Sequence, residues 1–208
     1  MERSIPKNEA RMMKSVLIGV VLSLAQDADP YTLTAPGGWR PERIPFPLSF
    51  APDLDYKGHE NLRFAPGMFK PEMADYFSYA FVLWIDGKMP FEPESLEKDL
   101  LKYYKGLCGS VARSRKLDLD LTRIAVKVTK QDQKGKLGGE DAEFLHAQID
   151  WYDPFVTGKP LTLHLEIWGR TADAGKRSCL FAIVSPKEKT EAVWETLRKI
   201  QVAFTCPK

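Results

Sequence analysis

Apolar and polar residues alternate with a period of two along much of the second half of this 208-residue chain. Residues 123–128, 145–151 and 161–168 each place apolar side chains on one parity and polar side chains on the other. This pattern is typical of antiparallel strands that pack one face on a core. Residues 75–85 and 179–184 are apolar on both parities, which indicates strands buried on both faces. The sequence therefore predicts an antiparallel sheet with these two segments near its middle.

A long helix is predicted between the first strands and the alternating ones. Residues 93–114 carry apolar side chains at spacings of three and four, and Pro93 suits the first turn. Gly106 and Gly109 each cost about 1 kcal/mol relative to alanine inside a helix. They either allow close packing against the sheet or mark an early end of the helix.

A second helix is predicted at the end of the chain, with Ser185 as its N-cap and Pro186 at its first position. Its apolar stripe consists of Val193, Leu197, Ile200 and Phe204. Residues 34–75 are rich in proline and predict only brief extended segments at 44–50 and 61–64. This order of elements predicts an α+β fold: an antiparallel β-sheet meander with a long central helix and a C-terminal helix packed on it.

The N-terminal residues have the pattern of an export signal. Basic residues precede an uninterrupted apolar run at 16–25, which suits a signal peptide and is too short to span a bilayer. Ser23 and Ala25 suit cleavage before Gln26. We therefore expect a signal peptide at 1–25, a linker at 26–35, a single domain at 36–208, and export to the periplasm or out of the cell. An uncleaved anchor and a buried N-terminal helix are the alternatives.

The charge of the chain is nearly balanced, with 30 Lys and Arg against 28 Asp and Glu. Residues 1–25 hold four of the basic and two of the acidic residues, so cleavage leaves 26 of each and no net charge. Nucleic-acid binders carry a basic surplus or stripe, which this chain lacks. Charge therefore predicts no nucleic-acid partner and, once the signal is removed, no attraction to a membrane.

Two short phrases and the order of elements carry a resemblance to a known fold. Gly38-Trp39 precedes the first strand, and the last helix ends in the phrase from Ile200 to Phe204. Over residues 36–205 the chain resembles the PsbP-like fold of photosystem oxygen-evolving subunits and their Ran-binding relatives. The resemblance implies a small non-catalytic domain that binds other proteins, sometimes with metal. It assigns no functional residue.

Three polar residues of the predicted meander form a candidate metal site. If residues that sum to about 310 pair across the hairpin, His146 lies opposite His164, close enough for both to bind one metal ion. Glu166 would supply an oxygen ligand, or would act with His146 as an acid–base pair. The alternative is a solvated sheet face of ordinary polar residues. A divalent metal is the only cofactor that the sequence suggests.

Aromatic residues give two candidate binding surfaces for a protein or a small ligand. Trp168 lies on the polar parity of its strand, where it is either an exposed binding residue or covered by a helix. Trp151, Tyr152 and Phe155 lead into the loop of the hairpin, where they either contact a partner or fold back on the core.

The three cysteines are assigned separately. Cys108 lies on the apolar stripe of the long helix and is expected to be a packed core thiol. Cys179 and Cys206 would form a disulfide if the last helix returned beside the strand that holds Cys179.

The chain has no familiar catalytic signature. It has no Gly-x-Ser-x-Gly elbow, and Gly138-Gly139 lacks the strand–glycine–helix context of a phosphate site. The sequence thus favours an exported, non-catalytic binding domain. A metal-binding protein or metal-dependent enzyme is the first alternative, and a structural component of the envelope is the second.

Overall fold

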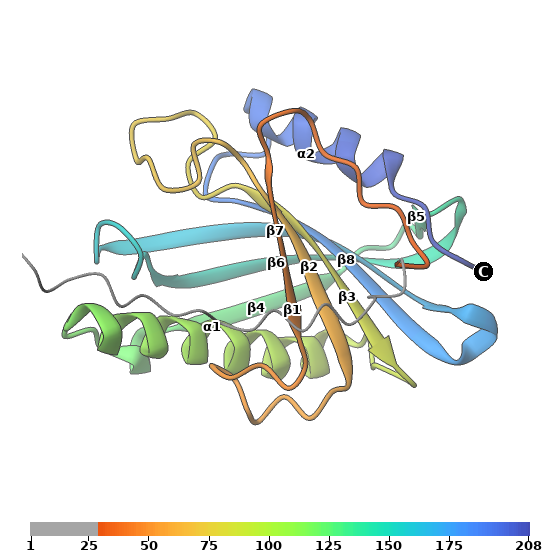
Figure 1. The fold of residues 1–208 in the computed structure, drawn as a ribbon, viewed down its shortest axis with the longest axis horizontal. Coiled ribbons are helices and arrows are strands. Elements are labelled where there is room, and N and C mark those ends of the chain that lie inside the picture. The colour runs from red at the N-terminus through yellow and green to blue at the C-terminus, as the bar shows by residue number, and fades with distance from the viewer. Residues whose placement is uncertain (1–28) are drawn as a thin grey trace, which may run out of the picture.

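The antiparallel sheet is the centre of the computed structural model, which describes residues 29–208 (Figure 1). Its strands are β1 (Arg40–Pro45), β2 (Gly58–Phe64), β3 (Tyr79–Asp86), β4 (Ala125–Lys130), β5 (Gly135–Leu137), β6 (Glu140–Tyr152), β7 (Pro160–Ala172) and β8 (Arg177–Ser185). The helices are α1 (Pro93–Arg115) and α2 (Ala192–Ala203), with 3-10 turns η1 (Leu121–Arg123) and η2 (Asp173–Gly175). The predicted α+β fold is confirmed.

The strands pair in the order β1-β2-β3-β8-β7-β6-β4, and β5 pairs with the start of β6. All these pairs are antiparallel. β3 and β8 are neighbours in the interior of the sheet and are buried on both faces, as their continuous apolar sequence predicts. β1 lies at one edge of the sheet. Pro41 and Pro45 lack a backbone N–H group, which an edge strand tolerates because it has a partner strand on one side only.

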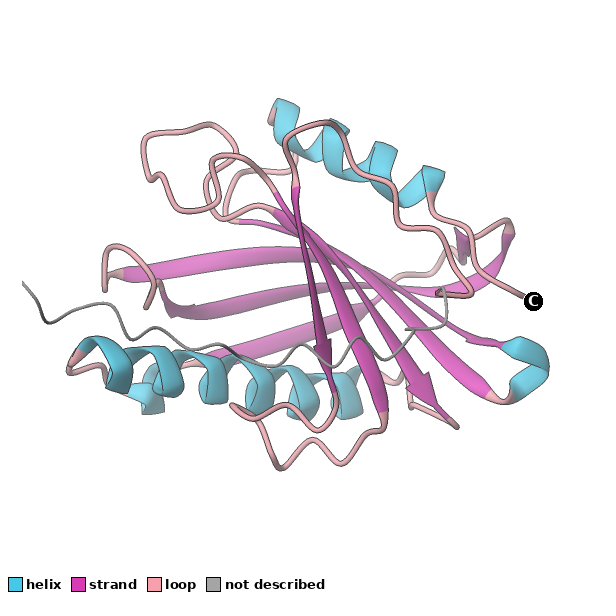
Figure 2. Ribbon diagram, viewed as in Figure 1, coloured by secondary structure: helices cyan, strands magenta, loops and turns pink. Residues whose placement is uncertain are grey.

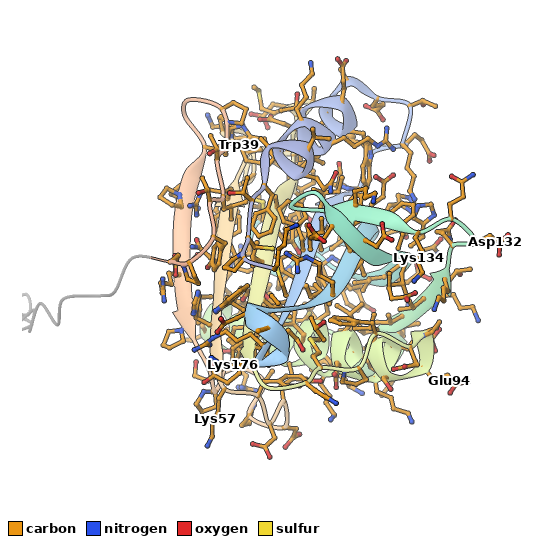
Figure 3. The ribbon with its side chains drawn as sticks, turned by 90° about the vertical axis from the view of Figure 1, so that its right-hand side faces the viewer. Trp39, Lys57, Glu94, Asp132, Lys134 and Lys176 are labelled. Atoms are coloured by element: carbon orange, nitrogen blue, oxygen red, sulfur yellow. The ribbon has the colours of Figure 1, made fainter. Side chains whose placement is uncertain are left out.

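Each face of the sheet carries its own core, and the two helices lie on opposite sides (Figures 1 and 2). The core under α1 is the larger and includes Leu62, Phe81, Leu165 and Val184. The core under α2 includes Trp84, Phe181 and Trp194. Alternate residues of each strand therefore pack into different cores. The periphery carries charged side chains, such as those of Lys57, Glu94, Asp132, Lys134 and Lys176 (Figure 3).

The long helix runs through both of its glycines. α1 continues to Arg115 and ends at Lys116, whose φ of 57° is left-handed. A Cβ atom at Gly106 would overlap the carbonyl oxygen of Phe50, so this glycine allows close approach of the backbone. The partner is the loop between β1 and β2, which runs beside α1, and not the sheet that the sequence suggested (Figure 1).

The predicted start of the last helix is wrong. Ser185 ends β8, and its hydroxyl contacts Ser78 Oγ at 2.8 Å and accepts from the Lys187 amide at 3.1 Å. The helix begins at Ala192, six positions after the predicted first position Pro186, because a turn follows Pro186. The predicted apolar stripe is confirmed, since all four of its side chains are buried: Val193, Leu197, Ile200 and Phe204.

The segment predicted as a linker packs on the domain from Asp29 onward. Tyr31 and Leu33 are buried in the core under α2, and Thr32 forms an isolated bridge with Thr205. The predicted signal peptide at 1–25 lies outside the described residues. None of the helices within 29–208 is long and apolar enough to cross a membrane.

Candidate functional site

A cavity of about 450 Å³ lies on the α1 side of the sheet, near the end where β1, β2 and β3 pair. Tyr103 and Leu107 of α1 and Leu62 of β2 form part of its wall. Most of the remaining wall is aromatic: Phe50, Phe64, Phe69, Phe77, Tyr79, Trp151 and Phe155. We call this space the α1 cavity. Its size and lining match small-molecule sites, which are concave, mostly apolar and about 300–1,000 Å³ in volume.

Two loops bound the α1 cavity. Residues 46–57 contribute Phe50, which is held against α1 by the close approach to Gly106. Residues 65–78 contribute Met68 and Phe77, and this loop is fixed where the Gly67 amide donates to Asp75 Oδ2 at 3.0 Å. The first loop is therefore positioned by a distant part of the chain, whereas this hydrogen bond lies within the second loop.

Phe77 has a left-handed backbone, with φ of 51°, although it is not glycine. Such a conformation is uncommon for a bulky residue and costs about 1–3 kcal/mol. Its ring is 1% exposed and packs edge-on against Trp151, with centroids 5.5 Å apart. The packing of the cavity wall therefore offsets the backbone strain.

Asp153 fixes the loop that carries Phe155. Its side chain is completely buried and accepts hydrogen bonds from Tyr76 Oη at 2.7 Å and from the amides of Phe155 at 2.9 Å and Thr157 at 2.7 Å. Burial alone would raise the pKa of Asp153, but these hydrogen bonds outweigh it and hold the pKa below its ordinary value. Asp153 is therefore a buried, ionised carboxylate that organises one side of the α1 cavity.

The indole Nε1 of Trp151 is an unpaired donor in this wall. Trp151 is 3% exposed, and no acceptor from residues 29–208 contacts its Nε1 atom. A buried donor without a partner costs about 1–3 kcal/mol. Trp151 also lines the α1 cavity, but its Nε1 atom has almost no accessible surface, so a ligand would reach this donor only after the Trp151 ring turns.

A buried carboxyl group lies beside the cavity. Tyr103 Oη donates to both carboxyl oxygens of Glu60, at 3.0 and 3.1 Å, and Glu60 has no solvent exposure. Burial raises the pKa of Glu60 to about 8, against the lowering effect of the Tyr103 hydrogen bond. The hydroxyl of Tyr79 is paired with that of Tyr104 at 2.7 Å. The wall therefore presents tyrosine rings whose polar ends are already satisfied.

The wall of the α1 cavity reaches the surface at β1 and at the loop 65–78. Glu42 is exposed, and Phe69 is 38% exposed although both line the cavity. The guanidinium of Arg40 lies over the Phe69 ring, 5.2 Å from its centroid. The outer edge thus combines an exposed aromatic ring with charges of both signs.

The structure separates the aromatic residues that the sequence singled out. Trp151 and Phe155 line the α1 cavity, so the hairpin loop folds back on the core. Tyr152 is buried in the same core but does not line the cavity. Trp168 is covered: it lies on the other face, is 7% exposed, and stacks on Phe144 with centroids 5.0 Å apart. The expectation of an exposed Trp168 is corrected.

The predicted pairing of the two histidines is wrong. The hairpin pairs His146 with Glu166 and Gln148 with His164, a register shifted by two residues from the predicted one. Glu166 is 5% exposed and is held by Arg198, whose Nη2 and Nε donate to its two oxygens at 2.7 and 3.1 Å. No group of three His, Cys, Asp or Glu side chains within the described part of the chain is arranged to hold a metal ion. The structure does not bring His146, His164 and Glu166 together as a ligand set.

Two of the three cysteines are neighbours. Cys108 is completely buried, and burial raises its pKa to about 11, as expected for a core thiol. Cys179 and Cys206 are both free thiols at the core under α2, and Arg170, which pairs with Cys179 across the sheet, contacts Cys206 Sγ at 2.9 Å. The structure therefore brings the predicted pair together without a covalent bond.

Sequence reasoning missed most of the cavity wall. Phe64 ends a predicted extended segment, and Phe69 lies in a loop for which no role was inferred. The sequence predicts Phe77 in the strand 75–85, but β3 begins only at Tyr79 and Phe77 lies in the loop before it. Glu60 is the one residue near the cavity whose sequence position indicates a buried polar group, because it is acidic and lies on the same parity of β2 as the apolar Leu62 and Phe64. That signal marks a buried carboxyl group but does not reveal a cavity.

Comparisons with known proteins give little further information. No protein family matches the sequence, and no curated protein matches it. Among solved structures the chain is similar to LpqN, which is described as involved in cell envelope biogenesis of Mycobacterium tuberculosis. The two are 14% identical, the match covers 84% of this chain and 82% of LpqN, and the TM-score is 0.35. A likeness at this level assigns no function, and the PsbP-like resemblance stays a prediction.

Proposed function

We propose that this protein is an exported, non-catalytic domain that binds a small apolar ligand in the α1 cavity. The observation that carries the proposal is the cavity itself: a volume of about 450 Å³ with a predominantly aromatic wall. The cavity opens to the surface at β1 and at the loop 65–78, so its aromatic wall is apolar surface accessible to water. A ligand that covers this surface would gain the free energy of burying it.

The ligand class follows from the wall. Its rings and methyl groups favour an apolar body, because burial of apolar surface contributes about 25 cal/mol per Å². A turn of the Trp151 ring on binding would expose its unpaired Nε1 to the ligand and favour a single hydrogen-bond acceptor on that body, such as a carbonyl or ether oxygen. Export is supported by the apolar run at residues 16–25. Mass spectrometry of the protein from its native source should find Gln26 as the first residue.

Titration with the fluorescent probe phenyl-naphthylamine tests the binding proposal. The probe is apolar and brightens when it leaves water, so saturable binding to the folded protein is the expected result. Leu107→Trp adds a large ring to the cavity wall and should weaken binding about tenfold or more, which corresponds to about 1.4 kcal/mol or more.

Leu101→Trp is the matched control. Leu101 is also a partly buried leucine of α1 that packs on the same core, but it does not line the α1 cavity. This variant should bind the probe as the wild type does. Equal loss of binding in both variants, or no saturable binding by the wild type, would contradict the proposal.

A further inference from the structure

The two neighbouring thiols lie on the opposite face of the sheet from the α1 cavity. Cys179 belongs to β8 and is completely buried, whereas Cys206 follows α2 and is partly exposed. Both side chains contact the core under α2, and Arg170, the cross-strand partner of Cys179, reaches Cys206 Sγ at 2.9 Å. The preceding residue, Thr205, is bridged to Thr32, so the backbone holds Cys206 at this position.

Arg170 of β7 fixes the tail on which Cys206 lies. Its Nη2 atom donates to Cys206 Sγ at 2.9 Å, to the Cys206 carbonyl oxygen at 3.2 Å and to the Pro207 carbonyl oxygen at 2.7 Å. Its Nε atom donates to the Leu137 carbonyl oxygen at 3.1 Å. A guanidinium group at this distance stabilises a thiolate more than a thiol.

We propose that Cys206 and Cys179 are a disulfide-forming pair in which the accessible Cys206 thiolate, held by Arg170, attacks first and the buried Cys179 resolves. The oxidant is a disulfide, either of a small thiol or of an oxidoreductase. The inference is independent of the α1 cavity.

The chemistry proceeds in two exchanges. Cys206 Sγ attacks one sulfur of the oxidant, the oxidant's S–S bond breaks, and one oxidant thiolate leaves. Cys179 then loses its proton to solvent or to that thiolate, and its sulfur attacks Cys206 Sγ. The mixed disulfide breaks and the second oxidant thiolate leaves. The protein loses two electrons and two protons, and the oxidant is reduced to two thiols.

The pKa values of the two thiols agree with attack by Cys206 before Cys179. The hydrogen bond from Cys179 and the charge of Arg170 lower the pKa of Cys206 to about 7, against the effect of burial. The hydrogen bond to Cys206 and burial raise the pKa of Cys179 well above its ordinary value. The other charged groups at this corner, Glu140 and Lys208, form an ion pair with each other at 2.9 Å. Cys206 is therefore the group that ionises near neutral pH.

The bond would connect the end of the chain to an interior strand. It would close a loop that contains the whole of α2, whose stripe fills the core on this face. A crosslink stabilises mainly by restricting the unfolded chain. The oxidised protein should therefore resist unfolding and C-terminal proteolysis more than the reduced protein.

Peptide mapping tests the pairing. The folded, reduced protein is equilibrated with excess oxidised glutathione, alkylated and mapped by mass spectrometry. We expect a Cys179–Cys206 crosslink and an alkylated Cys108 after denaturation. Free Cys179 and Cys206 at equilibrium, or a crosslink that includes Cys108, would overturn the proposal.

Two single variants test the order of attack. Cys179→Ser keeps a hydroxyl donor next to Cys206 and should accumulate glutathione on Cys206. Cys206→Ser should leave Cys179 unmodified while the protein is folded. The opposite pattern would overturn the assignment of Cys206 as the attacking thiol.

Arg170 is a positioning residue, and a pH profile separates its electrostatic role from a structural one. In the Cys179→Ser background, which keeps a hydroxyl donor and Arg170, the rate of glutathione addition should reach half its maximum below the ordinary cysteine pKa of 9.0. Arg170→Gln should move this midpoint to higher pH, and Arg170→Lys should restore part of the shift. An unchanged midpoint in a folded Arg170→Gln protein would refute the role of Arg170.

Discussion

Tyr103 Oη donates to both carboxyl oxygens of Glu60, at 3.0 and 3.1 Å, inside the core beside the α1 cavity. Glu60 is fully buried, and the nearby charged residue on the adjacent edge strand is Glu42, which disfavours ionisation further. The pKa of Glu60 is consequently about 8 in the folded state, against an ordinary value of 4.5. Glu60 is thus a proton-binding group of the native state at neutral pH.

We predict that the folded protein loses stability as the pH rises. Between pH 4.5 and about 8 the folded state holds a proton on Glu60 that the unfolded state has released. The free energy of unfolding should therefore fall across this window, by at most about 1.4 kcal/mol per pH unit. Glu60→Gln should remove this fall and should be more stable than the wild type at pH 9 by up to about 5 kcal/mol. Urea denaturation at intervals from pH 4 to pH 9 measures both curves.

Glu42→Gln is the control for the pH experiment. Glu42 is exposed on β1, so its substitution should leave most of the pH dependence in place. Parallel curves for the wild type and Glu60→Gln would show that Glu60 does not carry the dependence.

The two glycines of α1 should respond differently to alanine. At Gly106 a Cβ atom would overlap the carbonyl oxygen of Phe50, which is backbone and cannot rotate away. Gly106→Ala should therefore destabilise the protein by about 2 kcal/mol, despite the better helix propensity of alanine. At Gly109 the Cβ atom would meet a methyl group of Leu121 at 3.0 Å, which can move. Gly109→Ala should remain within about 1 kcal/mol of the wild type in urea denaturation, and equal costs at the two positions would contradict the close-approach argument.

Asp153 should contribute stability that is lost in acid. Its folded-state pKa is lowered, so the contribution is present above the ordinary pKa of an aspartate and disappears as the pH falls through the folded value. Asp153→Asn places an amide NH2 group among backbone N–H donors and should cost about 2–3 kcal/mol at neutral pH. The cost should shrink at low pH, which chemical denaturation at neutral pH and in acid would show. A cost independent of pH would mean that the charge of Asp153 is unimportant.

The parts of the fold that the sequence predicts are those with strong local patterns. β3 and β8 are recognisable because both faces of each strand are buried and their sequences are apolar throughout. α1 is recognisable from its stripe, which includes Leu96, Leu100 and Tyr104. The spacing of apolar residues along a strand or helix is a local property, so it can be seen in a single sequence.

The parts that could not be predicted depend on contacts between distant residues. The hairpin register differs by two because Tyr152 pairs with Pro160 and the loop between them is held by Asp153. The α1 cavity depends on where the loops 46–57 and 65–78 pack, and those positions are set by Gly106 and by Trp151. Neither contact leaves a periodic signal in the sequence.

We expect the Trp151 ring to turn on ligand binding so that its buried, unpaired Nε1 reaches the ligand, which should give the α1 cavity a measurable preference for ligands with an acceptor. Between a ketone and a hydrocarbon of the same size, the wild type should bind the ketone more tightly by about 1 kcal/mol, or about fivefold. Trp151→Phe keeps an aromatic ring in the wall but removes the donor, so it should abolish this difference and leave hydrocarbon binding largely intact. Competition with phenyl-naphthylamine measures both affinities. Trp168→Phe removes an indole from the opposite face and should preserve the preference, because Trp168 does not line the cavity. A preference that survives in Trp151→Phe would place the hydrogen bond elsewhere in the wall.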